Sequence, residues 1–565
     1  MTAIDRHNRD AGQGWQSLLI VLLMVLVAVL PIIIFRDFTP SNELRYLSIA
    51  DESLASGRWW AFTNHGIPYA DKPPLYLWCI ILGKWLFGSH MMWFYSLFSI
   101  IPAFVIAVVM YRWTREELAP EFQTSALLML FTCGLFAGMV FTLRMDMLMT
   151  MFIVLALRSF RQLELAVEKP PLGRRLLFAI WIFLAVFSKG PMGILIPLLA
   201  TTAWLLLTRR MRLWTRAWGW PAWTLLILLC AAWFGAVYAE GGTEYLDNLL
   251  VHQTVGRAVN SFHHKRPFWY YLVSLTYTLL PWTLVIFGAV VYGIRKYRRP
   301  DRSLFNYFLI IILTAFVLLS VISSKLQVYM LPAYPFMVYL AAMVCASHKE
   351  SGLVRAAIAI PAAILALGAL AMPFIADTGW FASLGLNLSR YPAIRVVWLL
   401  LLAGGFLTLW CLYRMKRTAS AIESLSLLVL ALVFVAGLSM RDFNPDLGYQ
   451  AISESALDFS KANPSAKIMT WRIDRPENID VYLGATPFST VEAPDSVTAM
   501  PVASYPAIVM TTLTSIPEVP YVQASQKIGS RYVVVYCDTT ANTFITPSTN
   551  EQDSRLRTDR HSTRL

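Results

Sequence analysis

The chain has 565 residues, of which 57% are hydrophobic, 13% aromatic and only 14% charged. Soluble proteins carry about 25% charged residues, and a single core of this length cannot bury so much apolar surface. The composition therefore excludes a soluble enzyme and predicts a polytopic membrane protein. The net charge of +13 does not indicate nucleic-acid binding, because Arg and Lys cluster in short connections between apolar runs. Five of the six cysteines lie in or beside apolar stretches, so no disulfide framework is predicted.

Thirteen apolar runs are candidates for membrane-spanning helices. A span takes about 20 apolar residues, and the fourth and fifth runs fall short of that length. The first run is of full length and lacks a clear small-residue cleavage site, so we interpret it as a span and not as a signal peptide. The runs are 17–36, 91–111, 124–142, 147–157, 176–188, 191–208, 220–239, 270–294, 304–322, 328–346, 354–375, 394–413 and 421–438.

Basic residues predict the orientation of these spans. Cytoplasmic connections carry the excess of Lys and Arg in membrane proteins. A cytoplasmic N-terminus places the basic connections on the inner side, and thirteen crossings then leave the C-terminus outside. The inner connections in this arrangement are 112–123, 158–175, 209–219, 295–303, 347–353 and 414–420.

Two segments are predicted to lie outside the lipid, next to a catalytic membrane part of residues 1–438. Residues 37–90 form a long first external loop that ends in a short amphipathic stretch, Leu75–Phe87, and its residues Asp51 and Glu52 are expected on a solvated helix face. Residues 439–565 are polar and long enough for a small α/β domain. Its β-rich runs are Ala466–Trp471, Ile479–Leu483, Ala507–Thr512 and Arg531–Tyr536.

Charged and tyrosine side chains gather on the predicted external side. Charges at membrane depth are costly and are functional candidates by default. Isolated cations there suit a phosphate or pyrophosphate, carboxylates take a proton, hold a metal or orient a sugar hydroxyl, and tyrosines offer stacking faces. A phosphate-bearing lipid substrate, handled at the outer surface, accounts for this pattern. The residues are Asn42, Glu43, Arg45, Tyr46, Tyr69, Asp71, Lys72, Arg144, Asp146, Lys189, Arg257, Lys325 and Tyr329.

Several motifs resemble a known superfamily. Asn42-Glu43-Leu44-Arg45-Tyr46 and Tyr69-Ala70-Asp71-Lys72-Pro73-Pro74 resemble the first loop of bacterial polyprenyl-phosphate-dependent glycosyltransferases of the GT-C class, the ArnT and protein-mannosyltransferase-like superfamily. Later motifs match in order over nearly the whole membrane part. They are Ser188-Lys189-Gly190, Pro267-Phe268-Trp269-Tyr270-Tyr271 and Lys325-Leu326 through Tyr329-Met330-Leu331-Pro332.

The resemblance implies transfer of one sugar from undecaprenyl phosphate to a cell-envelope acceptor at the periplasmic face of the bacterial inner membrane. In ArnT the sugar is 4-amino-4-deoxy-L-arabinose and the acceptor is a lipid A phosphate. The family opens its first loop with an Asp-Glu pair whose Asp is the usual catalytic carboxylate, and this chain has Asn42 before Glu43. An amide cannot act as a base. Either the acceptor is an ionised phosphate that needs none, or Glu43 or Asp71 takes over.

The same resemblance assigns roles to individual residues. Asn42, Glu43, Asp71 and Asp146 are the catalytic candidates, and Lys72 is expected at the carrier phosphate. The other expected contacts to carrier and sugar are Arg45, Tyr46, Tyr69, Lys189, Arg257, Lys325 and Tyr329. The family's acidic position at Asp71 is associated with a metal, for which Asp71, His252 and His264 are the candidate ligands here.

Simpler structural readings compete with each assignment. Arg45 and Tyr46 also suit a headgroup anchor, Asp71 and Lys72 a local ion pair, and Lys189 and Lys325 snorkelling ends of helices. Arg144 and Asp146 also suit a structural pair at a turn, and the histidines ordinary loop positions. Four other functions stay open: a transporter or flippase, a protein O-mannosyltransferase, another envelope glycosyltransferase, and a family member that has lost catalysis.

Overall fold

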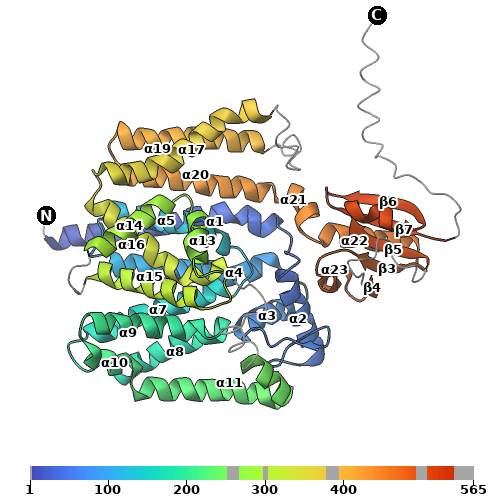
Figure 1. Cartoon of the computed structure of the whole chain (residues 1–565), viewed down its shortest axis with the longest axis horizontal. Helices are drawn as coiled ribbons and strands as arrows, with labels where there is room; N and C mark the ends of the chain where they lie inside the picture. The colour runs from blue at the N-terminus through green and yellow to red at the C-terminus, as the bar shows by residue number, and fades with distance from the viewer. Residues whose placement is uncertain (1–2, 251–265, 297–302, 377–392, 492–504, 540–565) are drawn as a thin grey trace, which may run out of the picture. The chain divides into compact units, whose positions relative to one another are not determined.

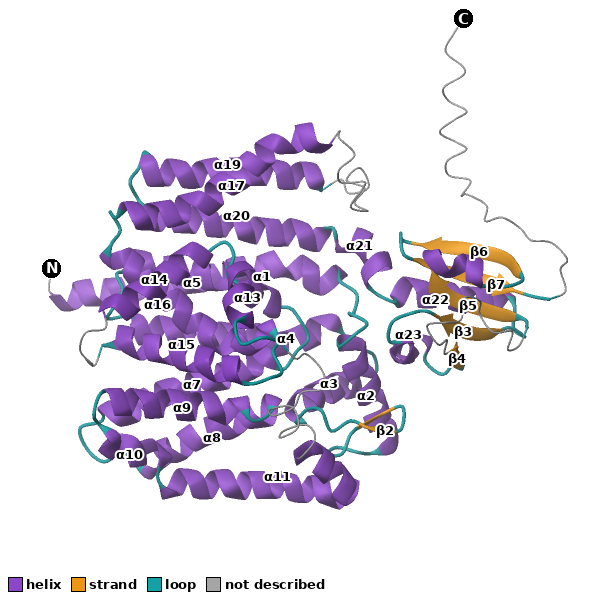
Figure 2. Cartoon of the chain, in the orientation of Figure 1, coloured by secondary structure: helices purple, strands orange, loops and turns teal. Residues whose placement is uncertain are grey.

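Helices form most of the described residues up to 439, and a five-stranded sheet forms after them (Figure 1; Figure 2). The chain separates into a helical unit of residues 1–35 and 49–439 and a sheet unit of residues 36–48 and 440–565. The start of the first external loop thus belongs with the C-terminal residues. The computed structural model describes residues 3–250, 266–296, 303–376, 393–491 and 505–539.

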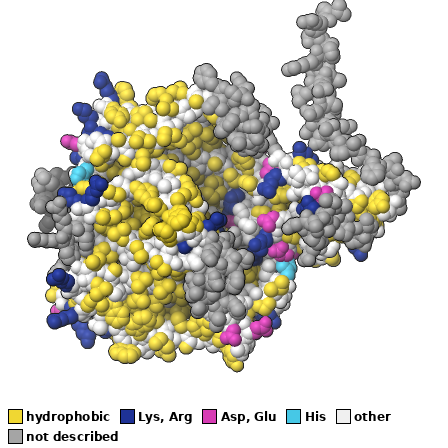
Figure 3. Space-filling model, in the orientation of Figure 1, with side chains coloured by type: hydrophobic (Ala, Val, Ile, Leu, Met, Phe, Trp, Pro, Cys, Tyr) yellow, Lys and Arg dark blue, Asp and Glu magenta, His cyan; other side chains and the backbone are white. Residues whose placement is uncertain are grey.

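The helical unit has the properties of a multi-pass membrane protein. Its long helices lie side by side with roughly parallel axes (Figure 1). Apolar side chains cover its visible face, and Lys and Arg gather toward the end of the helices that includes α10 (Figure 3). Eight described segments are long and apolar enough to cross a membrane. They are Gly14–Phe35, Met92–Thr114, Trp220–Leu250, Leu304–Val321, Gln327–Ser347, Gly352–Met372, Ile394–Tyr413 and Thr418–Leu438.

The helices follow the expected apolar runs, and the count of thirteen spans stays a prediction. Five expected runs correspond to helices that are shorter, more polar or broken. The helices of this unit are α1 (Ala3–Phe35), α2 (Glu43–Ser56, whose first turns lie in the sheet unit), α3 (Leu75–Phe87), α4 (Met92–Thr114), α5 (Pro120–Thr132), α6 (Gly134–Met139), α7 (Asp146–Leu165), α8 (Leu172–Lys189), α9 (Met192–Leu207), α10 (Trp214–Trp218), α11 (Trp220–Asp247), α13 (Tyr270–Thr278), α14 (Thr283–Lys296), α15 (Leu304–Val321), the 3-10 helix η3 (Gln327–Ala333), α16 (Tyr334–Ser347), α17 (Gly352–Ala376), α19 (Ile394–Tyr413) and α20 (Thr418–Leu438).

Two of the expected spans are each divided into two helices. The run 124–142 is divided at Cys133, whose backbone is extended between α5 and α6. The run 270–294 is divided near Pro281, because proline lacks the N–H that an inner helical turn requires. The backbone N–H of Gly134 donates to the carbonyl of Leu280 at 2.8 Å, so the two breaks lie against each other.

Glycines allow two close helix contacts in this unit. A Cβ atom on Gly405 of α19 would lie 2.8 Å from Ala366 Cβ of α17. A Cβ atom on Gly437 of α20 would lie 2.7 Å from the backbone nitrogen of Ile32 in α1. Membrane helices associate through such small residues because lipid supplies no hydrophobic drive between them.

The sheet unit contains a five-stranded mixed sheet in the order β4-β3-β5-β7-β6. β3 pairs in parallel with β4 and β5, whereas β7 pairs antiparallel with β5 and β6. Three of the four β-rich runs form strands as expected, but Ile479–Leu483 contains a helical turn, and two strands were not expected. The elements are α21 (Met440–Leu447), α22 (Gln450–Ala462), β3 (Lys467–Trp471), η5 (Pro476–Ile479), α23 (Asp480–Leu483), β4 (Phe488–Val491), β5 (Ala507–Thr512), η6 (Leu513–Glu518), β6 (Val522–Ile528) and β7 (Tyr532–Cys537).

Candidate functional site

A cavity of about 490 Å³ in the helical unit brings several predicted site residues together. Its walls come from the start of α3, the α8–α9 junction, α11, the end of α15 and η3. The predicted residues on its wall are Asp71, Lys72, Lys189 and Tyr329, and most of the remaining lining is apolar. The other lining residues are Pro73, Met149, Val186, Gly190, Pro191, Met192, Leu195, Trp233, Phe234, Leu249, Leu250, Leu318, Leu319, Ile322 and Ser324.

The turn before α3 presents Asp71 and Lys72 to this cavity. A short hairpin, β1 (Thr63–Asn64) with β2 (Ile67–Pro68), leads into the turn, and Pro74 precedes the first helical residue. The carbonyl of Tyr69 accepts a hydrogen bond from the Tyr245 hydroxyl at 2.7 Å. Tyr69 therefore contributes to the site by fixing the backbone just before Asp71.

A buried carboxylate holds Lys189 at its place in the cavity wall. Lys189 is the last residue of α8, and the next residue, Gly190, has a φ of 98°, which ends the helix. Asp146, the first residue of α7, is fully buried and forms ion pairs with Lys189 and with Arg144, the latter at 3.1 Å. Asp146 is thus a positioning residue for Lys189, and it does not itself line the cavity.

Tyr329 and Lys325 lie in and just before η3. The Lys189 Nζ atom lies 4.6 Å from the ring centroid of Tyr329, a cation–π distance. Lys325 is buried and donates to the carbonyls of Arg266 at 3.2 Å and Ile322 at 2.5 Å. Lys325 therefore joins Arg266 to the residues that follow α15 through hydrogen bonds. It does not line the cavity, whereas its neighbour Ser324 does.

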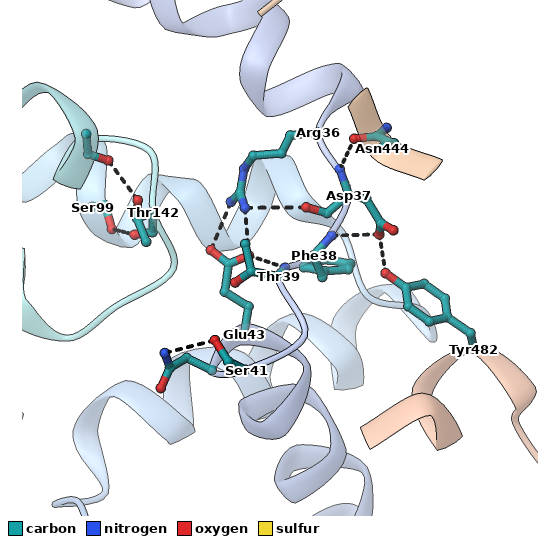
Figure 4. A network of polar contacts seen from close by, with 12 residues as sticks. Arg36, Asp37, Phe38, Thr39, Ser41, Glu43, Ser99, Thr142, Asn444 and Tyr482 are labelled. Atoms are coloured by element: carbon teal, nitrogen blue, oxygen red, sulfur yellow. Dashed lines mark hydrogen bonds and ion pairs between the residues drawn. The ribbon is translucent and has the colours of Figure 1, made fainter. Parts of the chain in front are cut away.

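The Asn42–Tyr46 motif lies in the sheet unit. Its Glu43 belongs to a network of polar contacts (Figure 4). The Glu43 carboxylate is 1% exposed and accepts from both terminal nitrogens of Arg36, at 2.7 and 2.9 Å, and from the Thr39 backbone at 2.8 Å. A bidentate pair between arginine and a carboxylate fixes the geometry of both groups. Asn42 is half-exposed. Its side-chain amide nitrogen donates to Ser41 Oγ at 3.4 Å, which is a long hydrogen bond.

Two more predicted residues follow on α2. Arg45 is half-buried and Tyr46 is 2% exposed. A hydroxyphenyl ring so enclosed is packed into the protein and offers no open face for stacking. The role of Tyr46 is therefore packing in this structure.

Asp37 joins this motif to the rest of the sheet unit. It accepts from the backbone N–H of Gln450 at 3.0 Å and from the Tyr482 hydroxyl, while its own N–H donates to Asn444 (Figure 4). Burial raises the pKa of Asp37, and the hydrogen bonds from Tyr482 and the backbone oppose this shift only in part.

The remaining candidates fall outside the described residues. They are Arg257 of the carrier site and His252 and His264 of the metal site. No group of three or more metal-ligating side chains is found within the described part of the chain.

Sequence reasoning missed Arg36, which occupies the carboxylate of Glu43. The ion pairs of Asp51 were not expected either: its side chain is 32% exposed and pairs with Lys84 at 3.1 Å and with His90 at 2.9 Å. His90 in turn contacts the Tyr95 hydroxyl at 2.8 Å. Arg36 is the last residue of the first expected run, 17–36, and lies seven residues before Glu43, which is the signal that was available.

Comparisons with known proteins agree with the expected superfamily. Residues 71–234 match the family described as dolichyl-phosphate-mannose-protein mannosyltransferase. The undecaprenyl phosphate-alpha-4-amino-4-deoxy-L-arabinose arabinosyl transferase of Edwardsiella ictaluri is 29% identical over 60% of this chain and 61% of its own. A similarly named enzyme of Pseudomonas fluorescens is 25% identical over 58% of this chain and 57% of its own. The chain thus matches about 60% of the length of these curated relatives.

Solved structures show the fold. ArnT from Cupriavidus metallidurans bound to undecaprenyl phosphate superposes with a TM-score of 0.69 at 20% identity, over 92% of this chain and 98% of ArnT. Archaeal oligosaccharyltransferase AglB from Archaeoglobus fulgidus superposes with a TM-score of 0.50 at 10% identity, over 94% of this chain and 75% of AglB. The expected fold class is confirmed: the chain has the GT-C fold of ArnT, and its residues 71–234 are similar to the mannosyltransferase family.

Proposed function

We propose that this chain transfers a single sugar from undecaprenyl phosphate to a cell-envelope acceptor, namely a phosphate of lipid A or of another lipopolysaccharide component. The arabinosyl transferases that it resembles are named for such a carrier. The observation that carries the proposal is the cavity lined by Lys72 and Lys189. Two cations in a mostly apolar wall suit a phosphate that enters on a lipid.

An apolar pocket on α15 supports a lipid carrier. It has a volume of about 220 Å³ and is lined by apolar side chains of α13 to α16, including Ile312 and Phe316. Leu319, which lines the Lys72 cavity, follows on the same helix at the spacing that places it on the same face. A polyprenyl tail bound along this face would leave its phosphate in the cavity.

The acceptor chemistry follows from the carboxylates. Asn42 cannot remove a proton, and the Glu43 oxygens already accept from Arg36 and Thr39. An ionised acceptor phosphate needs no base: its oxygen attacks the anomeric carbon, and the bond to the carrier phosphate breaks. The bonding electrons leave with the carrier phosphate, which Lys72 stabilises, and the anomeric configuration inverts. Asp71 is the remaining candidate for orienting the sugar or for holding a metal.

The domain arrangement and location belong to the same proposal. Residues 1–438 form the catalytic membrane domain, in which 37–90 is the first periplasmic loop, and 439–565 form a soluble periplasmic domain. Lys and Arg gathered at one end of the helices support a cytoplasmic N-terminus in the inner membrane, with the site at the periplasmic face (Figure 3).

The test compares Lys72→Met with Lys169→Met, an exposed lysine on the basic connection. Purified protein is mixed with lipid A and an undecaprenyl-phosphate sugar, and products are measured by mass spectrometry. The rate of sugar transfer by Lys72→Met should be at least a hundredfold lower, while its thermal unfolding stays unchanged. Lys169→Met should have the transfer rate of the unaltered protein. Full activity in Lys72→Met would refute the carrier-phosphate assignment.

A protein O-mannosyltransferase is the second candidate, favoured by the family match of residues 71–234. Cells with and without the chain distinguish the two. A lost sugar on lipid A supports the first candidate, and a lost hexose on periplasmic proteins supports the second.

A further inference from the structure

The parallel strands of the sheet unit diverge at their carboxyl ends. After β3 the chain continues to α23, which packs against α22 on one face of the sheet. After the neighbouring β5 it continues to η6, whose Leu513 and Ile516 pack in the core cluster on the other face, with Trp471 and Val509. Where adjacent parallel strands send their connections to opposite faces, a crevice opens at the carboxyl edge, and ligands bind there in open α/β sheets.

Arginines lie at this edge of the sheet. Thr470 is the last residue of β3 paired with β5, opposite Met510, and Arg472 follows two residues later. Thr512 pairs with Tyr532, and the N–H of Leu513 donates to the carbonyl of Arg531 at 2.8 Å. Arg531 thus lies beside the end of β5, and Arg472 lies just beyond the carboxyl end of β3.

Hydroxyl groups complete the end of β5. Thr512 Oγ1 contacts Thr514 Oγ1 at 3.1 Å and Ser515 Oγ at 2.9 Å. Hydroxyl and guanidinium groups together form a donor set that suits a phosphate. The Arg531 guanidinium also donates to the Asp446 carbonyl at 3.5 Å.

The loop after β3 contains Arg475 as well as Arg472, and the backbone of both residues is strained. Arg472 and Arg475 have φ of 50° and 53°, in the left-handed region that costs energy for residues with a Cβ. Within the described residues the Arg475 guanidinium forms no hydrogen bond or ion pair. Beside Arg472, the indole N–H of the fully buried Trp471 also finds no partner there. Backbone strain of this kind concentrates at binding sites.

Carboxylates face this edge as well, and they limit the ligand. Glu518 pairs with Arg472 at 3.1 Å, and Asp446 accepts from the Ser530 hydroxyl at 3.0 Å. Exposed Asp474 lies one residue before Arg475. The edge is therefore close to neutral, which disfavours a polyanion such as nucleic acid and suits a small, singly phosphorylated sugar unit.

We propose that the carboxyl edge of β3 and β5, with Arg472, Arg475, Arg531 and Thr512, is a second binding site that takes a phosphate-bearing saccharide. Arg475 and Arg531 bind the phosphate, and the hydroxyls at the end of β5 bind phosphate or sugar oxygens. The binding site itself does not depend on the proposed function. The identification of this saccharide as the acceptor does.

Binding without turnover tests the site. The full chain in detergent is titrated with acyl-free glucosamine disaccharide bearing one phosphate, with the same disaccharide lacking phosphate, and with inorganic phosphate. Arg475→Asn removes the charge while asparagine tolerates the left-handed backbone, and Arg475→Lys keeps the charge. The control is Lys461→Asn on α22, whose side chain is 78% exposed.

The phosphorylated disaccharide should bind the unaltered protein and Lys461→Asn equally, about tenfold more weakly to Arg475→Asn, and with intermediate affinity to Arg475→Lys. Loss of the phosphate should weaken binding at least as much as Arg475→Asn, because it also removes the contact to Arg531. Binding by inorganic phosphate alone, with no gain from the sugar, would overturn the saccharide site, as would equal binding by Arg475→Asn.

The Lys72→Met variant separates this site from the proposed transfer. It should bind the disaccharide normally while it transfers no sugar. If the acceptor is the ligand, Arg475→Asn raises the KM for lipid A several-fold and leaves kcat and the donor KM unchanged. A fall in kcat alone would refute the acceptor as the ligand.

Discussion

Lys189 lies 4.6 Å from the ring centroid of Tyr329 while its ammonium group forms an ion pair with the buried Asp146. One cation thus joins the ends of α8, α7 and η3 at the wall of the cavity. The position of Lys189 depends on Asp146, because a long lysine side chain without this partner would leave the wall.

Asp146→Asn tests this dependence. Removing one member of a buried ion pair leaves the other charges unpaired, and we expect a loss of about 3–5 kcal/mol in the free energy of unfolding. Transfer should fall at least tenfold, because Lys189 no longer faces the carrier phosphate. Thermal unfolding and product formation are measured beside Glu116→Gln, an exposed control in the same unit. Normal transfer activity in Asp146→Asn would show that Lys189 does not need Asp146 to take part in the site.

Asn42→Ala tests the absence of a catalytic base. An amide that only orients the acceptor contributes about 1 kcal/mol through a hydrogen bond, so transfer should fall about fivefold. The measurement is kcat with lipid A as acceptor. A thousandfold loss would show that Asn42 takes part in the chemistry and that an ionised acceptor is not enough.

Phe316→Trp tests the lipid pocket on α15. A larger ring displaces methylene groups of the carrier tail, each worth about 0.8 kcal/mol of burial. The KM for a full-length undecaprenyl donor should rise at least fourfold, whereas a donor with a short prenyl chain should be unaffected. Val317→Phe, at a position 59% exposed on the same helix, is the control. Equal effects on long and short donors would place the tail elsewhere.

Asp51→Asn tests a pH dependence of stability. Burial raises the pKa of Asp51, but the hydrogen bond with His90 and the charge of Lys84 outweigh it, so the pKa lies below its usual value. A lowered pKa means that the carboxylate stabilises the folded state above about pH 3.9, the unfolded value, and that this contribution is lost as the pH falls through the folded pKa.

The effect should be about 1 kcal/mol or less, because the Asp51 side chain is 32% exposed. At pH 7 the thermal midpoint of Asp51→Asn should lie below that of the unaltered protein. The two curves should approach each other in the acid range, and a difference that stays constant with pH would contradict the ion-pair origin of the shift.

The sequence predicted the helices well because long apolar runs have few alternatives to a membrane span. It predicted Lys72 and Lys189 in one site because isolated external charges are conspicuous against lipid. The breaks at Cys133 and Pro281 were less visible, since their flanks remain apolar. Pro281 is a helix breaker in principle, but membrane helices tolerate proline often enough to hide the break.

Pairings between residues of the site could not be predicted. Arg36 was missed, and Asp146 was expected as a catalytic candidate and not as the partner of Lys189, because sequence spacing does not say which carboxylate a given cation will meet. Ile479–Leu483 was expected to form a strand from its apolar residues, yet four residues suffice for one helical turn as well. β6 was missed because four of its seven residues are exposed and polar or small.

The hydrogen bond between Asp37 and Tyr482 joins residues 445 positions apart, and the one between Asp37 and Asn444 spans 407. During synthesis on the ribosome, the segment 36–48 therefore waits for nearly the entire chain before it meets its partners. Until then Glu43 has Arg36, but Asp37 has neither Tyr482 nor Gln450. A protein truncated after the last membrane helix would keep every span and still lack the folded surroundings of its first loop, so such a fragment is a poor minimal enzyme.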